Sequence, residues 1–258
     1  MSSDETTSTR PRWLVPVAVG VVVALIAVGG GIWWYLRDDS PPPVSLDAAV
    51  SAAGDRSTTT GAEPDATGST GEGVTGTWTV QAADGDISFE DDEAGSFAGI
   101  RIQEELSTIG STTAVGRTPD VTGSITIEGT MLTEATFEVD LTTITTNEQR
   151  RDSKVQSALE TDEFPTATFT LTEPVDLGEA ATSGGPVAVD APGELTIHGV
   201  TNDVTVPIEA QLVDGTIVVV GSAEIAFSDW GVEVPSSPVV LSVADVGTLE
   251  VQLLLDRT

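Results

Sequence analysis

Apolar and polar residues alternate along most of the chain from residue 74 to residue 258. Ala135, Phe137 and Val139 fall on one parity between polar neighbours, and residues 204–212 and 249–255 repeat the pattern. Successive side chains of a β-strand point to opposite faces, so a period of two gathers the apolar residues on one face. The pattern predicts a series of half-buried strands.

Turn-forming residues separate these strands. Hairpin signals stand at residues 128–129, 199–202 and 214–215, each of which contains glycine. About eight strands with one apolar face each predict an antiparallel barrel or a sandwich. A closed barrel of this size can hold one elongated ligand, which a sandwich usually cannot. Pro207 lies within a strand pattern, so we expect that strand to be at an edge or interrupted there.

One segment breaks the strand pattern. Residues 148–159 contain no proline or glycine, so they can form one or two helical turns. Pro165 then disfavours helix at Phe164, and residues 166–172 alternate again. The segment is either a surface helix that joins two strands or part of the border of a barrel mouth.

The N-terminal region has a different composition. Residues 13–36 contain no charged residue and would span about 36 Å as a helix, enough to cross a bilayer. Trp13 stands at one end and Trp33 and Trp34 at the other, as in membrane-interface belts. A cleaved signal peptide is the alternative, but its shorter apolar core would end in small residues. We predict a single transmembrane helix at 13–36.

Arg10 and Arg12 precede this helix, so the positive-inside rule predicts that residues 1–12 form a cytoplasmic tail and that the rest lies outside the cytoplasm. Residues 37–73 are rich in Pro, Ser, Thr, Gly and acidic side chains, with few large apolar ones after Leu46. Such a segment buries too little apolar area to offset its ordering entropy, so we predict a disordered linker. The domain would then comprise residues 74–258.

Charge excludes one class of partner. The chain carries a formal net charge of −31, and residues 74–258 contain 32 Asp/Glu against 6 Lys/Arg, or −26. Nucleic-acid binding needs a positive stripe, so no nucleic-acid partner is expected. An acidic solubilising surface is the simplest explanation of the charge. There is no cysteine, which excludes a disulfide framework and a lipid-modified cysteine anchor.

The sequence shows no evident set of catalytic residues. His198 is the only histidine, precedes a glycine turn and is predicted to be a surface or turn residue. Asp91, Asp92 and Glu93 could bind a divalent ion, but they lack the alternation of an EF-hand loop, and a solvated charge run is favoured. We expect no enzyme activity, no metal site and no cofactor.

Four passages resemble the YceI-like family of lipocalin-like, polyisoprenoid-binding barrels. Residues 76–80 are similar to its opening tryptophan strand, residues 193–204 to its Gly-Val-Thr hairpin, and residues 150–169 to its helix and proline restart. Residues 97–105, followed by 114–118, resemble a variant of membrane-anchored actinobacterial members. The resemblance implies a barrel whose interior takes a long isoprenoid chain, such as an isoprenoid quinone or a polyprenyl phosphate.

Two sets of residues are candidates for such a site. Inward apolar residues could line a ligand channel or fill a packed core, and these are Phe137, Val139, Phe169, Leu171, Leu195, Ile197, Ile225 and Phe227. Cations could hold a phosphate head group, and these are Arg101, Arg117, Arg150, Arg151 and Lys154. Parity places Arg101 outside the lumen, and pairing with Asp152, Glu104 or Glu105 is the alternative role of the cations.

The leading hypothesis is therefore non-catalytic binding of an isoprenoid lipid, which the barrel would carry, store or shield at the cell envelope. The alternative is a ligand-free extracytoplasmic structural or interaction module, which would have a solid core. Hydrolysis or isomerisation by paired carboxylates is the remaining option. The sequence does not indicate a protein partner or an oligomeric state.

Overall fold

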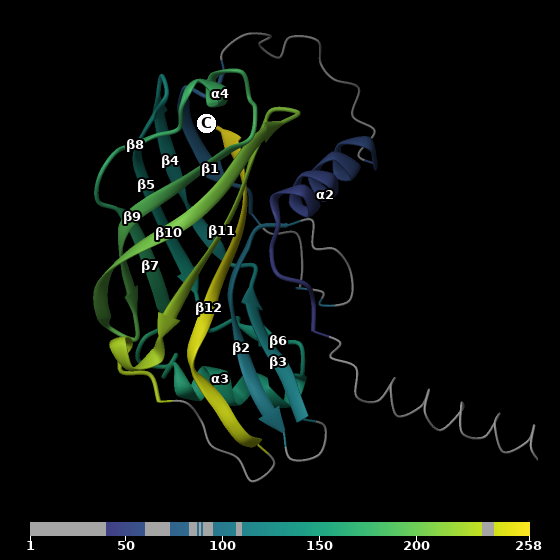
Figure 1. Cartoon of the computed structure of the whole chain (residues 1–258), viewed down its shortest axis with the longest axis vertical. Coiled ribbons are helices and arrows are strands. Elements are labelled where there is room, and N and C mark those ends of the chain that lie inside the picture. Colours follow the sequence, from purple (N-terminus) through teal and green to yellow (C-terminus); the bar gives the residue numbers. More distant parts are fainter. Residues whose placement is uncertain are drawn as a thin grey trace, which may run out of the picture. The chain divides into compact units, whose positions relative to one another are not determined.

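Eight antiparallel strands close into a barrel (Figure 1). The computed structural model describes residues 40–59, 73–82, 87, 89, 95–106, 110–233 and 240–258. The ring runs through β1 (Gly76–Val80), β4 (Val121–Glu128), β5 (Met131–Asp140), β7 (Thr166–Leu171), β9 (Val187–Ile197), β10 (Val200–Val213), β11 (Thr216–Ala226) and β12 (Val240–Arg257). Pairing of β1 with β12 completes it, which confirms the predicted barrel and excludes a sandwich.

The long strand β12 pairs with two different strands along the same edge. It pairs with β1 at residues 255–257 and with β2 (Phe97–Leu106) over residues 240–252. Strand β2 continues into β3 (Gly110–Thr118) and then β6 (Thr145–Thr146), while the short β8 (Val175–Asp176) pairs with β5. The three strands β2, β3 and β6 thus extend the sheet beyond the closed ring.

Left-handed residues make the predicted tight turns. His198 and Gly199 have φ values of 51° and 73°, and Asp214 and Gly215 have 50° and 91°. Two successive residues at positive φ match the twist of the flanking strands in a two-residue hairpin. Pro207 pairs with Asp190 of β9, and the ladder between β10 and β11 begins at the next residue. The proline, which has no N–H to donate, lies where β10 has a partner on one side only.

The predicted helix is present at η1 (Gln149–Arg151) and α3 (Asp152–Ala158). Two more short helices, α4 (Glu179–Thr182) and η2 (Phe227–Trp230), were not predicted. A fold with only one helical segment was therefore too simple a prediction. Elements of four residues show no helical period in a sequence, because one turn already takes 3.6 residues.

A longer helix corrects the predicted linker. Helix α2 (Leu46–Thr59) lies within residues 37–73 and packs outside the barrel against β10 and β11 (Figure 1). Its contacts come from Leu46, Ala49, Val50 and Ala53, which share one helix face at spacings of three and four residues. The prediction of disorder was wrong for α2, because it weighed the number of apolar residues and not their spacing. Residues 37–39 and 60–72 lie outside the described residues.

Two further predictions fall on residues that the structure does not describe, the transmembrane helix at 13–36 and the acidic run at 91–93. Among the described helices, none combines the length and the apolar character needed to cross a bilayer.

Candidate functional site

The barrel encloses one long apolar cavity. Its wall is formed by residues of β2, β4, β5, β7, β9, β10, β11 and β12. The centre of a water-sized sphere can occupy about 250 Å³ of it. On this measure one water molecule needs about 10–15 Å³, so the lumen is an open space and not a packing defect.

The cavity runs the length of the barrel. On β9 its lining extends from Val187 to Ile197, ten residue steps or about 33 Å along the strand. Leu177 and Ala181 line it near α4, while Leu159 and Trp230 line it near α3 and η2. A long, narrow space of this kind suits a chain-like ligand better than a compact one.

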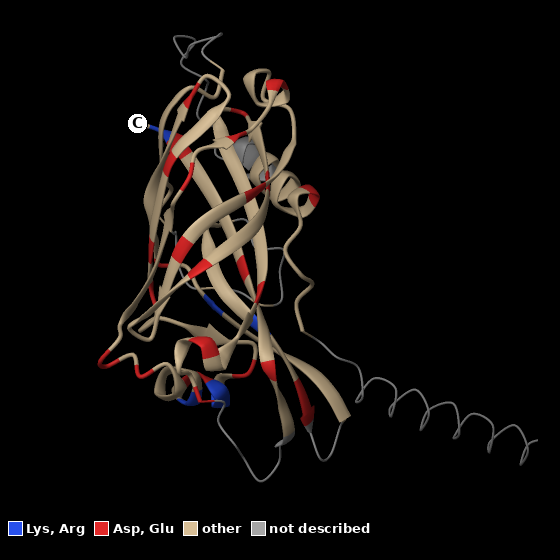
Figure 2. Cartoon of the chain, turned by 60° about the vertical axis from the view of Figure 1, so that its left-hand side comes forward, with Lys and Arg blue, Asp and Glu red and all other residues tan. Residues whose placement is uncertain are grey.

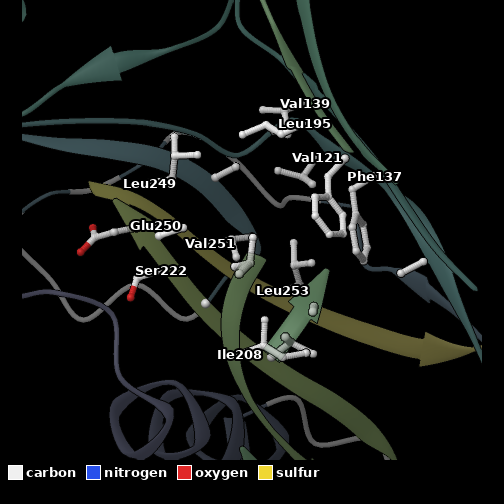
Figure 3. Close-up of a pocket in the computed structure, with 18 of the residues that line it drawn as sticks. Val121, Phe137, Val139, Leu195, Ile208, Ser222, Leu249, Glu250, Val251 and Leu253 are labelled. Carbon is white, nitrogen blue, oxygen red and sulfur yellow. The ribbon is translucent and has the colours of Figure 1, made fainter. Parts of the chain in front are cut away.

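All eight predicted lumen residues lie in the wall of this cavity, and Figure 3 shows part of the arrangement. Phe137 of β5 stands directly opposite Phe169 of β7 in the strand register, and the next inward pair along the same strands places Val139 beside Ala167. Leu195 and Ile197 follow on β9, and Ile225 and Phe227 on β11 and η2. The period-two pattern therefore identified the correct face of each strand.

The charged side chain in the wall points away from the lumen. Glu250 contributes to the wall, but its carboxylate is directed away from Val251 and Leu253 on the same strand (Figure 3). It is the one charged residue among the described lining residues. A ligand inside the barrel would therefore meet hydrocarbon surfaces and no ionic partner.

The Glu250 carboxylate lies on the outer wall between two arginines. The Arg101 Nε donates to its Oε1 at 3.0 Å, and Arg117 Nη2 lies 3.4 Å from its Oε2. Arg101 also donates to the Pro41 carbonyl at 2.8 Å, and the Val44 N–H donates to Glu250 at 3.4 Å. We call residues 40–59 the N-terminal strap. These contacts fasten its first part to the barrel.

This arrangement revises the set of head-group candidates. Arg101 and Arg117 bind Glu250 on the outer wall, and Arg117 also lies 4.2 Å above the Phe97 ring, so both guanidinium groups are outside the lumen. The expectation that Arg101 is outside was correct, but its partner is Glu250 rather than Glu104 or Glu105. The sequence could not reveal this pairing, because Arg101 and Glu250 are 149 residues apart.

The other three cations lie on η1 and α3, near the end of the cavity lined by Leu159 (Figure 2). Arg151 Nη2 lies 2.7 Å from Glu104 Oε2, and pairing of a cation with Glu104 was one of the predicted alternatives. Arg150 is 91% exposed beside Glu148, and Lys154 is exposed on α3. The structure thus separates the five candidate cations into an outer-wall pair and a group at one end of the barrel.

His198 occupies the predicted turn, and its ring joins three elements at the same end. Its Nδ1 is 3.2 Å from the Trp230 carbonyl, and its Nε2 is 3.1 Å from the Glu160 carboxylate. The Phe164 ring meets the imidazole edge to face at 4.7 Å. These contacts connect the β9–β10 turn to η2 and to the residues that follow α3. Within the described ranges, no group of three metal-binding side chains occurs.

Sequence analysis missed part of the wall. Ile125 and Val219 share the parity that identified the eight candidates and could have been found in the same way. Leu159 and Trp230 could not, because they come from short helical segments at the barrel end.

Comparison with solved structures gives distant similarities. The chain aligns with a polyisoprenoid binding domain from Saccharophagus degradans at 20% identity and a TM-score of 0.48, over 63% of this chain and 98% of that one. BcnA from Burkholderia cenocepacia aligns at 16% identity and 0.48, over 61% and 95%. A Campylobacter jejuni YCEI protein aligns at 20% and 0.45, over 55% and 84%. No curated protein matches the chain.

A family model gives a broader match. The model of the YceI-like domain matches residues 45–255, which include α2 and every strand of the ring except the last two residues of β12. The N-terminal strap is thus largely inside the matched region, beyond the boundary predicted at residue 74. Because the match covers most of the sequence, this chain belongs to the YceI-like family.

Proposed function

We propose that the barrel binds the isoprenoid chain of a lipid without reacting with it, and that it carries, stores or shields this lipid. The observation that carries the proposal is the open apolar cavity, into which no charged side chain of the described wall points. Burial of each CH₂ group supplies about 0.8 kcal/mol, so even part of a tail gives useful affinity. The polyisoprenoid ligand itself is what the family resemblance implies.

The same cavity is the reason to prefer this function over a ligand-free module. A module of that kind needs only a stable core, and such cores are packed to crystal-like density. A lumen of about 250 Å³ leaves apolar side chains without partners along the barrel. We propose that the lipid chain supplies the missing contacts.

The head group would remain outside the lumen. The cations on η1 and α3 make that end the better site for a phosphate, with Arg150 and Lys154 exposed there. A quinone head group would not need them. Replacing both by glutamine should weaken the binding of a polyprenyl phosphate and leave the binding of an isoprenoid quinone unchanged.

Mass spectrometry of lipids that co-purify with the full-length chain tests the main proposal. Recovery of an isoprenoid lipid is the expected result. A lumen-filling variant, Ala210→Trp, should lose it, because Ala210 lines the cavity. Ala188→Trp is the matched control, since Ala188 is exposed on the adjacent strand. Equal lipid content in the two variants, or no isoprenoid in the wild type even after addition of quinone and polyprenyl phosphate, would overturn the proposal.

We also propose that residues 13–36 anchor the barrel in the cell membrane with residues 1–12 in the cytoplasm. The charge-free segment and its flanking aromatic residues support this. The chain contains no cysteine, so single cysteines can report on either side. A membrane-impermeant maleimide should label Ser153→Cys in intact cells, and Ser2→Cys only after permeabilisation. The reverse labelling pattern would contradict the orientation.

A further inference from the structure

Glycines stand beside the aromatic rings of the lumen wall. Three phenylalanines line the cavity, and each lies across a glycine of a neighbouring strand. The pairs are Phe137 with Gly123, Phe169 with Gly193, and Phe227 with Gly247. Each glycine has inward parity, so its missing side chain would have pointed into the barrel.

The rings occupy the space that a side chain would take. A Cβ atom on Gly193 would lie 2.4 Å from both Cε2 and Cζ of Phe169. A Cβ on Gly247 would lie 2.6 Å from Cζ of Phe227. One on Gly123 would lie 2.2 Å from the Thr136 carbonyl oxygen and 2.7 Å from Cδ1 of Phe137. Real Cβ atoms essentially never come within 3.0 Å of another heavy atom, so an alanine at Gly193 would force the Phe169 ring or the backbone beside it to shift. The rings therefore lie deeper in the wall than they could if any other residue replaced these glycines.

We propose that these glycines set the bore of the lumen and thereby let it accept a methyl-branched chain. This inference rests on the proposed function, because it explains which lipid chains fit. An isoprenoid chain is wider at each methyl branch than a linear acyl chain. Rings seated over glycine leave that width free, and rings pushed inward would exclude the branched chain first.

Gly247 gives the cleanest test. The three atoms nearest to its hypothetical Cβ belong to the side chains of Phe227 and Ile100, and its backbone does not require glycine. Gly193 would also meet the Thr170 carbonyl, and Gly123 has a φ of +146° that strains any other residue. Gly54→Ala on α2 is the matched control, since nothing lies within 4 Å of that Cβ.

The experiment compares geranylgeraniol with hexadecan-1-ol. Their main chains have the same number of carbons, and the former adds the methyl branches and double bonds of an isoprenoid chain. Full-length wild type and variants are incubated with each radiolabelled alcohol, and bound ligand is counted after gel filtration, with Ala210→Trp as background. Gly247→Ala should lower geranylgeraniol affinity about tenfold, the scale of one methylene in an apolar pocket, with a smaller loss for hexadecan-1-ol. Adding Phe227→Leu to Gly247→Ala should restore binding, and Gly54→Ala should leave it unchanged.

Equal losses for both alcohols, or no rescue by Phe227→Leu, would overturn the inference, because general damage to the barrel would then explain the result. Wild type that binds neither alcohol would instead count against the proposed function. A crystal structure of Gly247→Ala tests the inference independently of any lipid. A Phe227 ring that has not moved inward, in a lumen of unchanged volume, would overturn it.

Discussion

The two faces of β12 both lie inside the fold, yet they are built in different ways. Leu249, Val251 and Leu253 face a lumen that the chain itself leaves open. Glu250 and Leu254 on the opposite face are 3% and 2% exposed, because the N-terminal strap and neighbouring side chains cover them. Burial alone therefore does not distinguish a binding surface from a structural contact.

What differs is the origin of the covering group. The outer face receives its cover from the same chain, and charged residues are tolerated there because each carboxylate oxygen of Glu250 has an arginine partner. The inner face has no cover and no charge. An uncovered apolar surface inside a barrel indicates a ligand, while a covered surface with paired charges indicates a fixed attachment.

The largest expected effect comes from breaking the outer-wall charges. Glu250→Ala leaves the guanidinium groups of Arg101 and Arg117 in a buried environment without their carboxylate, so unfolding free energy should fall by about 3–5 kcal/mol. Urea unfolding followed by tryptophan fluorescence measures it. Glu148→Ala removes the partner of the exposed Arg150 and should change stability by less than about 1 kcal/mol. Similar values for both variants would mean that the buried ion pairs stabilise the fold no more than the exposed one.

A pair of leucines gives an intermediate effect and compares the two faces directly. Leu46 of the strap is 8% exposed and packs against other apolar side chains. Leu46→Ala should therefore lower the free energy of unfolding by about 2–3 kcal/mol. Leu249 already borders open space, and Leu249→Ala should cost only about 1–2 kcal/mol, because few packed contacts are lost. Lipid uptake should change in Leu249→Ala only. Loss of uptake in Leu46→Ala with the fold intact would mean that the strap takes part in binding.

The smallest effect concerns Asp176, a solvent-facing residue near the α4 end of the lumen. The backbone N–H of Gly178 and the hydroxyl of Thr130 stabilise its carboxylate, which lowers the pKa of Asp176 below its usual 3.8. The charged form is therefore favoured in the folded state, so this stabilisation is complete above about pH 4 and disappears as pH falls through the lowered pKa. Thermal unfolding of Asp176→Ala and wild type should differ slightly at neutral pH and converge in acid. A difference that grows in acid would have the wrong sign.

The sequence predicted the barrel and its inward face, because alternation directly reports which side chains share a side of a strand. It did not predict that the lumen is open, since Phe137 and Phe169 would satisfy the same pattern in a packed core. The role of Gly193 depends on which ring crosses it, which only the strand register reveals. The strap was missed because it has few apolar residues. Leu46 and Ala49 form a packing face only when the segment is helical and lies against Val218 and Leu254 of the outer wall.

The closure between β1 and β12 also determines when the barrel can form. It pairs Trp78 with Arg257, and the guanidinium group of Arg257 lies 4.7 Å from the Trp78 ring. Contacts between residues so distant in sequence require a long loop to close first, which slows folding. During synthesis, β4 and β5 can pair early as a local hairpin, but the ring stays open until residues 255–257 have left the ribosome. Until then the future lumen is one face of an open sheet, and this is the stage at which its apolar wall is most exposed to aggregation.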